Sequence, residues 1–151
     1  MALLTDGYRG WMGGLRTGDV TAWESVFSRY VADLGLCNAK RTIDALSEWV
    51  TAIDTLSTRR VNVCPPGERR LCRDECMAVS MVAAAQADAC PALRACAFAL
   101  IGSSHVDPVV ATTETLAGEL RESDHLLAPS MIVAPDLLTL PPTAHAGQQM
   151  N

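Results

Sequence analysis

Apolar side chains return every three or four residues over 23–34 and again over 43–56, the spacing of one face of an α-helix. Residues 21–24 read Thr-Ala-Trp-Glu, a capping-box pattern that predicts the start of the first helix. Gly35 is suited to end that helix, and Asn38 is suited to cap the second. Because the link is so short, the sequence predicts that the two helices pack as antiparallel neighbours.

Three more helices are predicted downstream, over 68–87, 91–102 and 107–122. A loop over 57–66 precedes them, because its Pro-Pro-Gly end cannot continue a helix. Each of the last two helices has a proline in its first turn, where no helical hydrogen bond is lost. We therefore expect an all-α protein, built as a bundle of four to five amphipathic helices.

The two ends of the chain differ from this central bundle domain over 19–124. The segment 1–18 carries five glycines and predicts an irregular N-terminal segment. The segment 125–151 mixes prolines with large aliphatic side chains, which a solvated tail would not carry. We expect an extended C-terminal arm that packs on a groove of its own domain or of a neighbouring chain. Its apolar residues are Met131, Ile132, Val133, Leu137, Leu138 and Leu140.

Charge is sparse and uneven along the chain. Charged residues make up 19% of the sequence, and the formal net charge is −5. Residues 1–75 carry ten basic and ten acidic side chains, whereas residues 76–151 carry two basic and seven acidic ones. This acidic balance argues against general nucleic-acid binding. No apolar run approaches the roughly 18 residues of a membrane helix, and the N-terminus does not resemble a signal peptide. We expect a protein of the cytoplasm or of a particle such as a virion, not secreted by a signal peptide.

Six cysteines fall between residues 37 and 96, and three interpretations fit them. As small apolar residues they would pack in the core, which is the interpretation we favour. Four thiolates on or beside the third and fourth predicted helices would instead hold zinc or copper, although their spacing matches no zinc knuckle or ribbon. A disulfide is the third interpretation, with Cys37 and Cys64 as the plausible pair. The four metal-ligand candidates are Cys72, Cys76, Cys90 and Cys96.

Five of the twelve basic residues lie within fifteen positions around the Pro-Pro loop. Arginine in a first helical turn opposes the helix dipole, so its presence there is not explained by helix stability. Arginines placed there would bind a phosphate backbone or an acidic partner, such as the acidic half of another copy. The alternative is a solvated basic loop that nearby acidic residues neutralise. The cluster consists of Arg59, Arg60, Arg69, Arg70 and Arg73.

The sequence contains no pattern that indicates catalysis. No histidine lies near a cysteine in sequence, and no glycine-rich phosphate-binding motif occurs. Asp74 and Glu75 are adjacent rather than on one helical face, so we interpret them as a solvated helix edge. Trp11, Trp23 and Trp49 are predicted to be core or interface anchors. We expect no enzymatic activity, no catalytic residues and no cofactor.

These observations favour a non-enzymatic structural subunit that self-associates or packs into a larger assembly through its helix faces and arm. The more specific form of this hypothesis is a coat or shell protein, and the more general form is an accessory subunit of a multiprotein complex. Two alternatives stay open: a cytosolic cysteine-rich bundle that binds zinc or copper, and a small regulatory protein that binds another macromolecule.

Overall fold

The computed structural model describes residues 1–134, and the prediction of an all-α fold is confirmed. That part of the chain contains six α-helices, not the four to five expected, and one short 3₁₀ helix, with no strand. The apolar residues Leu137, Leu138 and Leu140 of the predicted arm lie outside the described residues. The elements are α1 (Ala2–Thr17), α2 (Val20–Leu34), α3 (Leu36–Leu56), α4 (Arg73–Gln86), α5 (Cys90–Ile101), α6 (Asp107–Glu122) and η1 (Pro129–Met131).

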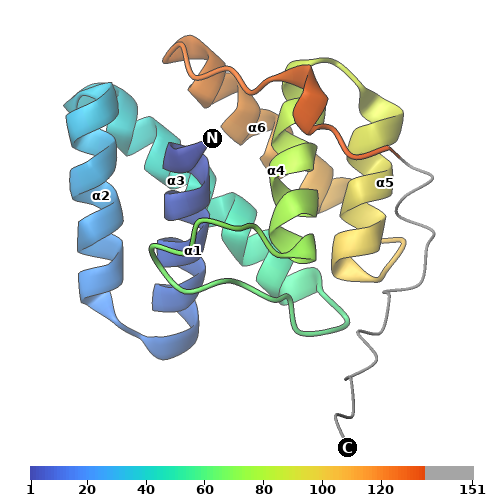
Figure 1. Cartoon of the computed structure of the whole chain (residues 1–151), viewed down its shortest axis with the longest axis horizontal. Helices are drawn as coiled ribbons and strands as arrows, with labels where there is room; N and C mark the ends of the chain where they lie inside the picture. Colours follow the sequence, from blue (N-terminus) through green and yellow to red (C-terminus); the bar gives the residue numbers. More distant parts are fainter. Residues whose placement is uncertain (135–151) are drawn as a thin grey trace, which may run out of the picture.

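The helices form two groups that α3 joins. Helices α1 and α2 lie side by side at one end of the molecule, and α4 and α5 lie side by side at the other (Figure 1). The longest helix, α3, runs between the groups and contacts α1, α2 and α6. All six helices contribute buried side chains to one core. Trp49 of α3 is fully buried there, with its ring 5.3 Å from that of Tyr8 in α1.

The N-terminal segment 1–18 is not irregular as expected, because its first seventeen residues are almost entirely helical. Its glycines do not break the helix; three of them form a face that packs against α2. A Cβ atom at any of the three would lie 2.4 Å or less from an α2 side chain, so only glycine allows this approach. These residues are Gly7, Gly10 and Gly14.

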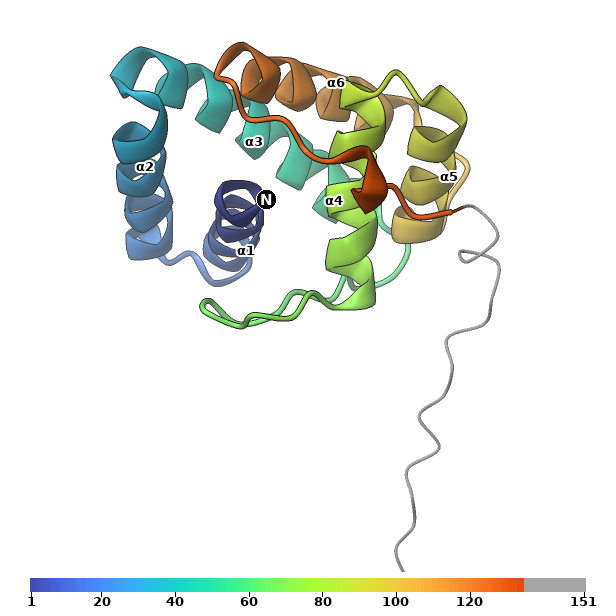
Figure 2. The same cartoon turned by 45° about the horizontal axis from the view of Figure 1, so that its top comes forward.

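Several helix ends differ from the predicted ones. Helix α2 begins at Val20, where the Asp19 carboxylate accepts a hydrogen bond from the Thr21 amide (2.9 Å), in place of the predicted capping box. A single residue, Gly35, links α2 to α3, and its φ of 78° is one that glycine tolerates best. The two helices therefore diverge as a V rather than running antiparallel (Figure 2).

Helix α4 begins at Arg73, five residues later than predicted. Residues 57–72 form one long loop, which crosses in front of α1 in Figure 1 and returns to α4.

The described part of the C-terminal segment packs on its own domain. Residues 123–134 run back across α4, and the half-buried side chains of Met131, Ile132 and Val133 contact the core (Figure 2). The Val133 amide donates a hydrogen bond to Ser80 Oγ (2.8 Å). We expected the arm to pack either on its own domain or on a neighbouring chain. These three residues pack on their own domain.

None of the helices within residues 1–134 combines the length and the apolar character that crossing a membrane requires.

Candidate functional site

Two adjacent carboxylates at the start of α4 organise the long loop. Asp74 and Glu75 are buried, so the interpretation of these residues as a solvated helix edge is wrong. The reason is that the loop folds back over them and supplies hydrogen-bond donors to both. A buried carboxylate is tolerated only with such compensation.

Glu75 accepts four hydrogen bonds. Arg9 of α1 binds both of its oxygens, through Nε (2.7 Å) and Nη2 (3.0 Å). The backbone amides of Cys64 and Cys72 donate to the same carboxylate, one to each oxygen, at 2.9 and 3.1 Å. Burial alone would raise the pKa of Glu75, but these donors outweigh it and lower the pKa to about 2. The Glu75 carboxylate is therefore ionised, and each of its two oxygens accepts two hydrogen bonds.

Arg9 also holds the part of the loop around residues 68–70. Its Nη1 donates to the carbonyl of Glu68 (2.6 Å) and its Nη2 to the carbonyl of Arg70 (2.9 Å). One side chain thus ties α1, the loop and α4 together. Sequence reasoning missed Arg9 because it lies far from the arginine cluster, in a segment that we expected to be irregular.

The five arginines of the cluster do not act as one group. Arg59 forms a bidentate ion pair with Asp74, at 2.7 and 2.8 Å. Burial would raise the pKa of Asp74, yet the Arg59 guanidinium and the Asn62 amide hold that pKa below its usual value. The charge of Arg59 is therefore compensated within the fold.

The other four arginines of the cluster are exposed along the loop and at the start of α4. Within residues 1–134, Arg60, Arg69 and Arg70 form no ion pair. Together with Arg73, which the fold also exposes, they make the loop a basic surface.

The predicted cysteine quartet is not brought together. The cysteine-containing cluster of potential ligands within the described residues consists instead of Cys64, Cys72 and Glu75, whose ligand atoms lie within 4.8 Å of one another. Cys96 is buried in α5 against Ser80, with 3.3 Å between Sγ and Oγ, as core packing predicts. Cys90 is exposed at the start of α5.

All six cysteines are free thiols in the structure, so the pair Cys37–Cys64 is not bridged. Cys37 is exposed, whereas Cys64 is half-buried beside Cys72. The Cys72 thiol donates a hydrogen bond to the Asn62 carbonyl (3.4 Å). Burial raises the pKa of Cys72 to about 11, so this thiol is protonated at neutral pH.

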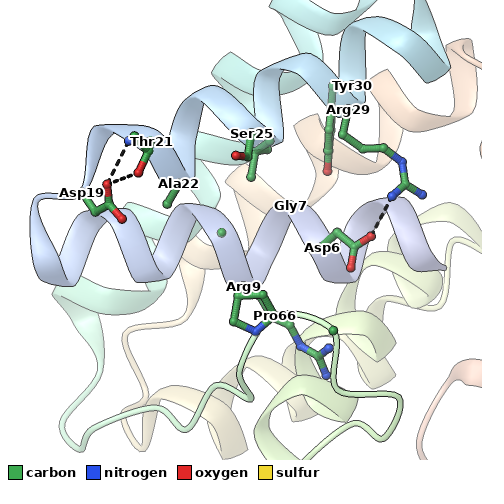
Figure 3. Close-up of a pocket in the computed structure, with 13 residues that line it drawn as sticks. Asp6, Gly7, Arg9, Asp19, Thr21, Ala22, Ser25, Arg29, Tyr30 and Pro66 are labelled. Carbon is green, nitrogen blue, oxygen red and sulfur yellow. Dashed lines mark hydrogen bonds and ion pairs between the residues drawn. The ribbon is translucent and has the colours of Figure 1, made fainter.

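An open groove of about 570 Å³ lies between α1 and α2, with Pro66 of the loop at its side (Figure 3). Its charged groups are paired with neighbours: Arg29 contacts Asp6 at 3.1 Å, and Asp19 accepts from Thr21. Figure 3 shows Arg9 directed away from α2 toward the loop. The groove is therefore a sizeable depression, but its lining residues present no acid–base pair for catalysis.

On another face of the same two helices lies a surface of exposed and half-exposed apolar side chains. Trp11 and Trp23 stack with 5.5 Å between ring centroids, and Trp23 Nε1 donates to the Trp11 carbonyl (3.2 Å). Phe27, one turn after Trp23, lines the same shallow depression. Leu15 and Val20 extend this face by helical spacing and are exposed. We call Trp11, Leu15, Val20, Trp23 and Phe27 the aromatic patch.

Comparisons with protein families, with curated proteins and with solved structures found no match.

Proposed function

We propose that this protein is a non-enzymatic structural subunit that associates with copies of itself through the aromatic patch. The observation that carries the proposal is the stacked pair of Trp11 and Trp23, half-exposed beside Phe27. Tryptophan and phenylalanine are enriched at the centres of protein interfaces, where they supply most of the binding energy.

The Trp23 ring at the centre of the patch is already held in place in the single chain, which supports an interface role. Gly14 allows α1 to approach the Trp23 indole, and the Trp23 Nε1 hydrogen bond fixes that ring against α1. A preorganised aromatic surface loses little side-chain entropy when a partner covers it. The third tryptophan, Trp49, is fully buried and belongs to the core.

Charge complementarity offers a second contact between copies. The basic surface of the loop exposes Arg60, Arg69 and Arg70. Asp88 and Glu114, which line one depression between α4, α5 and α6, are exposed on the acidic half of the chain. Contact between these surfaces would speed association and make it sensitive to salt. A phosphate backbone is the other partner that the arginines would suit.

Analytical ultracentrifugation of two matched variants tests the proposal. Val20 and Leu36 are each the first residue of a helix, and their side chains are 56% and 53% exposed. A glutamate is favourable at either position because of the helix dipole, so neither substitution disturbs the fold. Only Val20 belongs to the aromatic patch.

We expect the wild-type protein to sediment as an oligomer whose mass rises with concentration. Val20→Glu should shift it toward the monomer, because a charge is then buried in the apolar contact. Leu36→Glu should sediment as the wild type does. A monomeric wild-type protein at all concentrations, or equal disruption by both variants, would refute the proposal.

The mass of the native particle separates the finer forms of this function. A coat or shell subunit forms large particles of one repeated chain, whereas an accessory subunit is found in stoichiometric complex with other proteins. A small regulatory binder would remain a monomer on its own, which the same sedimentation experiment detects.

A further inference from the structure

The thiols of Cys64 and Cys72 lie together because one carboxylate holds both backbones. Glu75 accepts the amide of Cys64 on Oε1 and the amide of Cys72 on Oε2. Seven residues separate these cysteines in the sequence, yet their sulfur atoms lie within 4.8 Å of one another. Arg9 in turn fixes the carboxylate from α1. The fold therefore preorganises a pair of sulfur ligands.

We propose that Cys64 and Cys72 form a two-coordinate site for Cu(I), with Glu75 as the residue that positions both ligands. Two metal–sulfur bonds of roughly 2.3 Å, the length typical of thiolates on a metal, can bridge sulfur atoms that lie within the 4.8 Å limit of this cluster. Cys64 and Cys72 are half-buried residues of a surface loop rather than residues of the core.

The donor set distinguishes Cu(I) from zinc. Glu75 already accepts four hydrogen bonds, so its oxygens are not free to bind a metal. Among residues 1–134, that leaves two sulfur ligands in the cluster. Structural zinc requires four ligands in a tetrahedron, whereas soft thiolates alone suit Cu(I).

Charge at the loop supports the bound state. Binding releases one proton from each thiol to the solvent, and two thiolates with one Cu(I) carry a net charge of −1. The loop that joins the two cysteines exposes Arg69 and Arg70, which form no ion pair within the described part of the chain. Both cations belong to the loop that carries the two ligands, and positive charge near an anionic site favours it.

Competition with a chromophoric Cu(I) chelator, in ascorbate and without oxygen, tests the site in the full-length protein. We expect the wild-type protein to withdraw one copper per chain from the chelator. Cys64→Ser and Cys72→Ser should each abolish this withdrawal. Cys90→Ser removes an exposed thiol from another helix and should bind copper as the wild type does.

Alkylation of the wild-type protein gives a readout that does not depend on the folding of variants. In alkaline buffer, where part of the Cys72 thiol ionises, bound Cu(I) should protect Cys64 and Cys72 from iodoacetamide, while Cys37 and Cys90 react at the same rate with or without copper. The site is refuted if wild-type protein leaves copper on the chelator. Protection of other cysteines in place of this pair, or binding of zinc without Cu(I), refutes it equally.

Discussion

Arg9, in the middle of α1, and Glu75, in the first turn of α4, form a bidentate ion pair with side chains that are 3% and 1% exposed. They are 66 positions apart in the sequence. The same guanidinium donates to two loop carbonyls, and the same carboxylate accepts two loop amides. Besides α3, the pair is therefore a second connection between the two helical groups, and it also holds the loop between them.

Arg9→Met should destabilise the fold by about 3–5 kcal/mol, because it leaves the Glu75 charge buried without its partner. The measurement is urea unfolding followed by far-ultraviolet circular dichroism. Arg41→Met is the matched control: Arg41 contacts Glu119 at 2.8 Å, but its side chain is 52% exposed. Exposed ion pairs contribute little, so the control should unfold almost as the wild type does. Equal urea midpoints for the two variants would show that the buried pair stabilises the fold no more than the exposed pair does.

The glycines of α1 provide a test of close helix packing. At Gly14, a Cβ would lie 2.4 Å from Trp23 Nε1, so Gly14→Ala should destabilise the protein by roughly 1–3 kcal/mol through overpacking. At the adjacent Gly13, a Cβ would meet nothing within 4 Å. Gly13→Ala should therefore stabilise the helix by about 0.5–1 kcal/mol. Opposite signs of these changes in urea unfolding are the expected result, and two changes of the same sign would contradict the packing.

Sequence patterns predicted the helices that have an ordinary amphipathic face and failed where glycine or a buried charge determines the structure. The apolar runs of α2 and α3 are evident at helical spacing. Helix α1 was missed because glycine usually weakens a helix, whereas here Gly7, Gly10 and Gly14 allow close contact with α2. Spacing of small residues by three and four was the signal that could have found it.

The candidate site was harder to predict than the fold because its partners are far apart in sequence. No residue close to Glu75 in the sequence indicates that Arg9 will neutralise it. Asp74 and Glu75 were therefore interpreted as a solvated helix edge. The same long-range contacts bring Cys64 to Cys72 and separate Cys72 from Cys90 and Cys96. Local spacing along helices could not reveal a cluster that a loop assembles.

The chain has two tyrosines, Tyr8 and Tyr30, and both are buried. Burial raises both phenol pKa values well above the ordinary value of 10, and Asp74 and Asp6, respectively, add to this effect. The folded state therefore keeps protons that the unfolded chain releases above pH 10. Their contribution to stability is complete below that pH and is lost as the pH rises.

Alkaline titration should thus show phenolate absorbance appearing only together with loss of helical circular dichroism. The variant Tyr8→Phe is the control, since the single remaining phenol should still ionise with unfolding. A phenolate signal that develops near pH 10 while the helices stay intact would contradict the burial of these rings.

Two truncations separate the packed start of the C-terminal segment from the rest. Deleting 128–151 removes Met131, Ile132 and Val133 from the core, together with the Val133–Ser80 hydrogen bond. Half-burial of three aliphatic side chains is worth roughly 2–4 kcal/mol, so this variant should melt at a clearly lower temperature. Deleting only 135–151 retains these contacts, so this variant should melt at a higher temperature than the longer deletion. If Leu137, Leu138 and Leu140 help to join copies, the shorter deletion should still weaken association in the ultracentrifuge. A shorter deletion that sediments like the full chain would leave assembly to the aromatic patch and the charged surfaces.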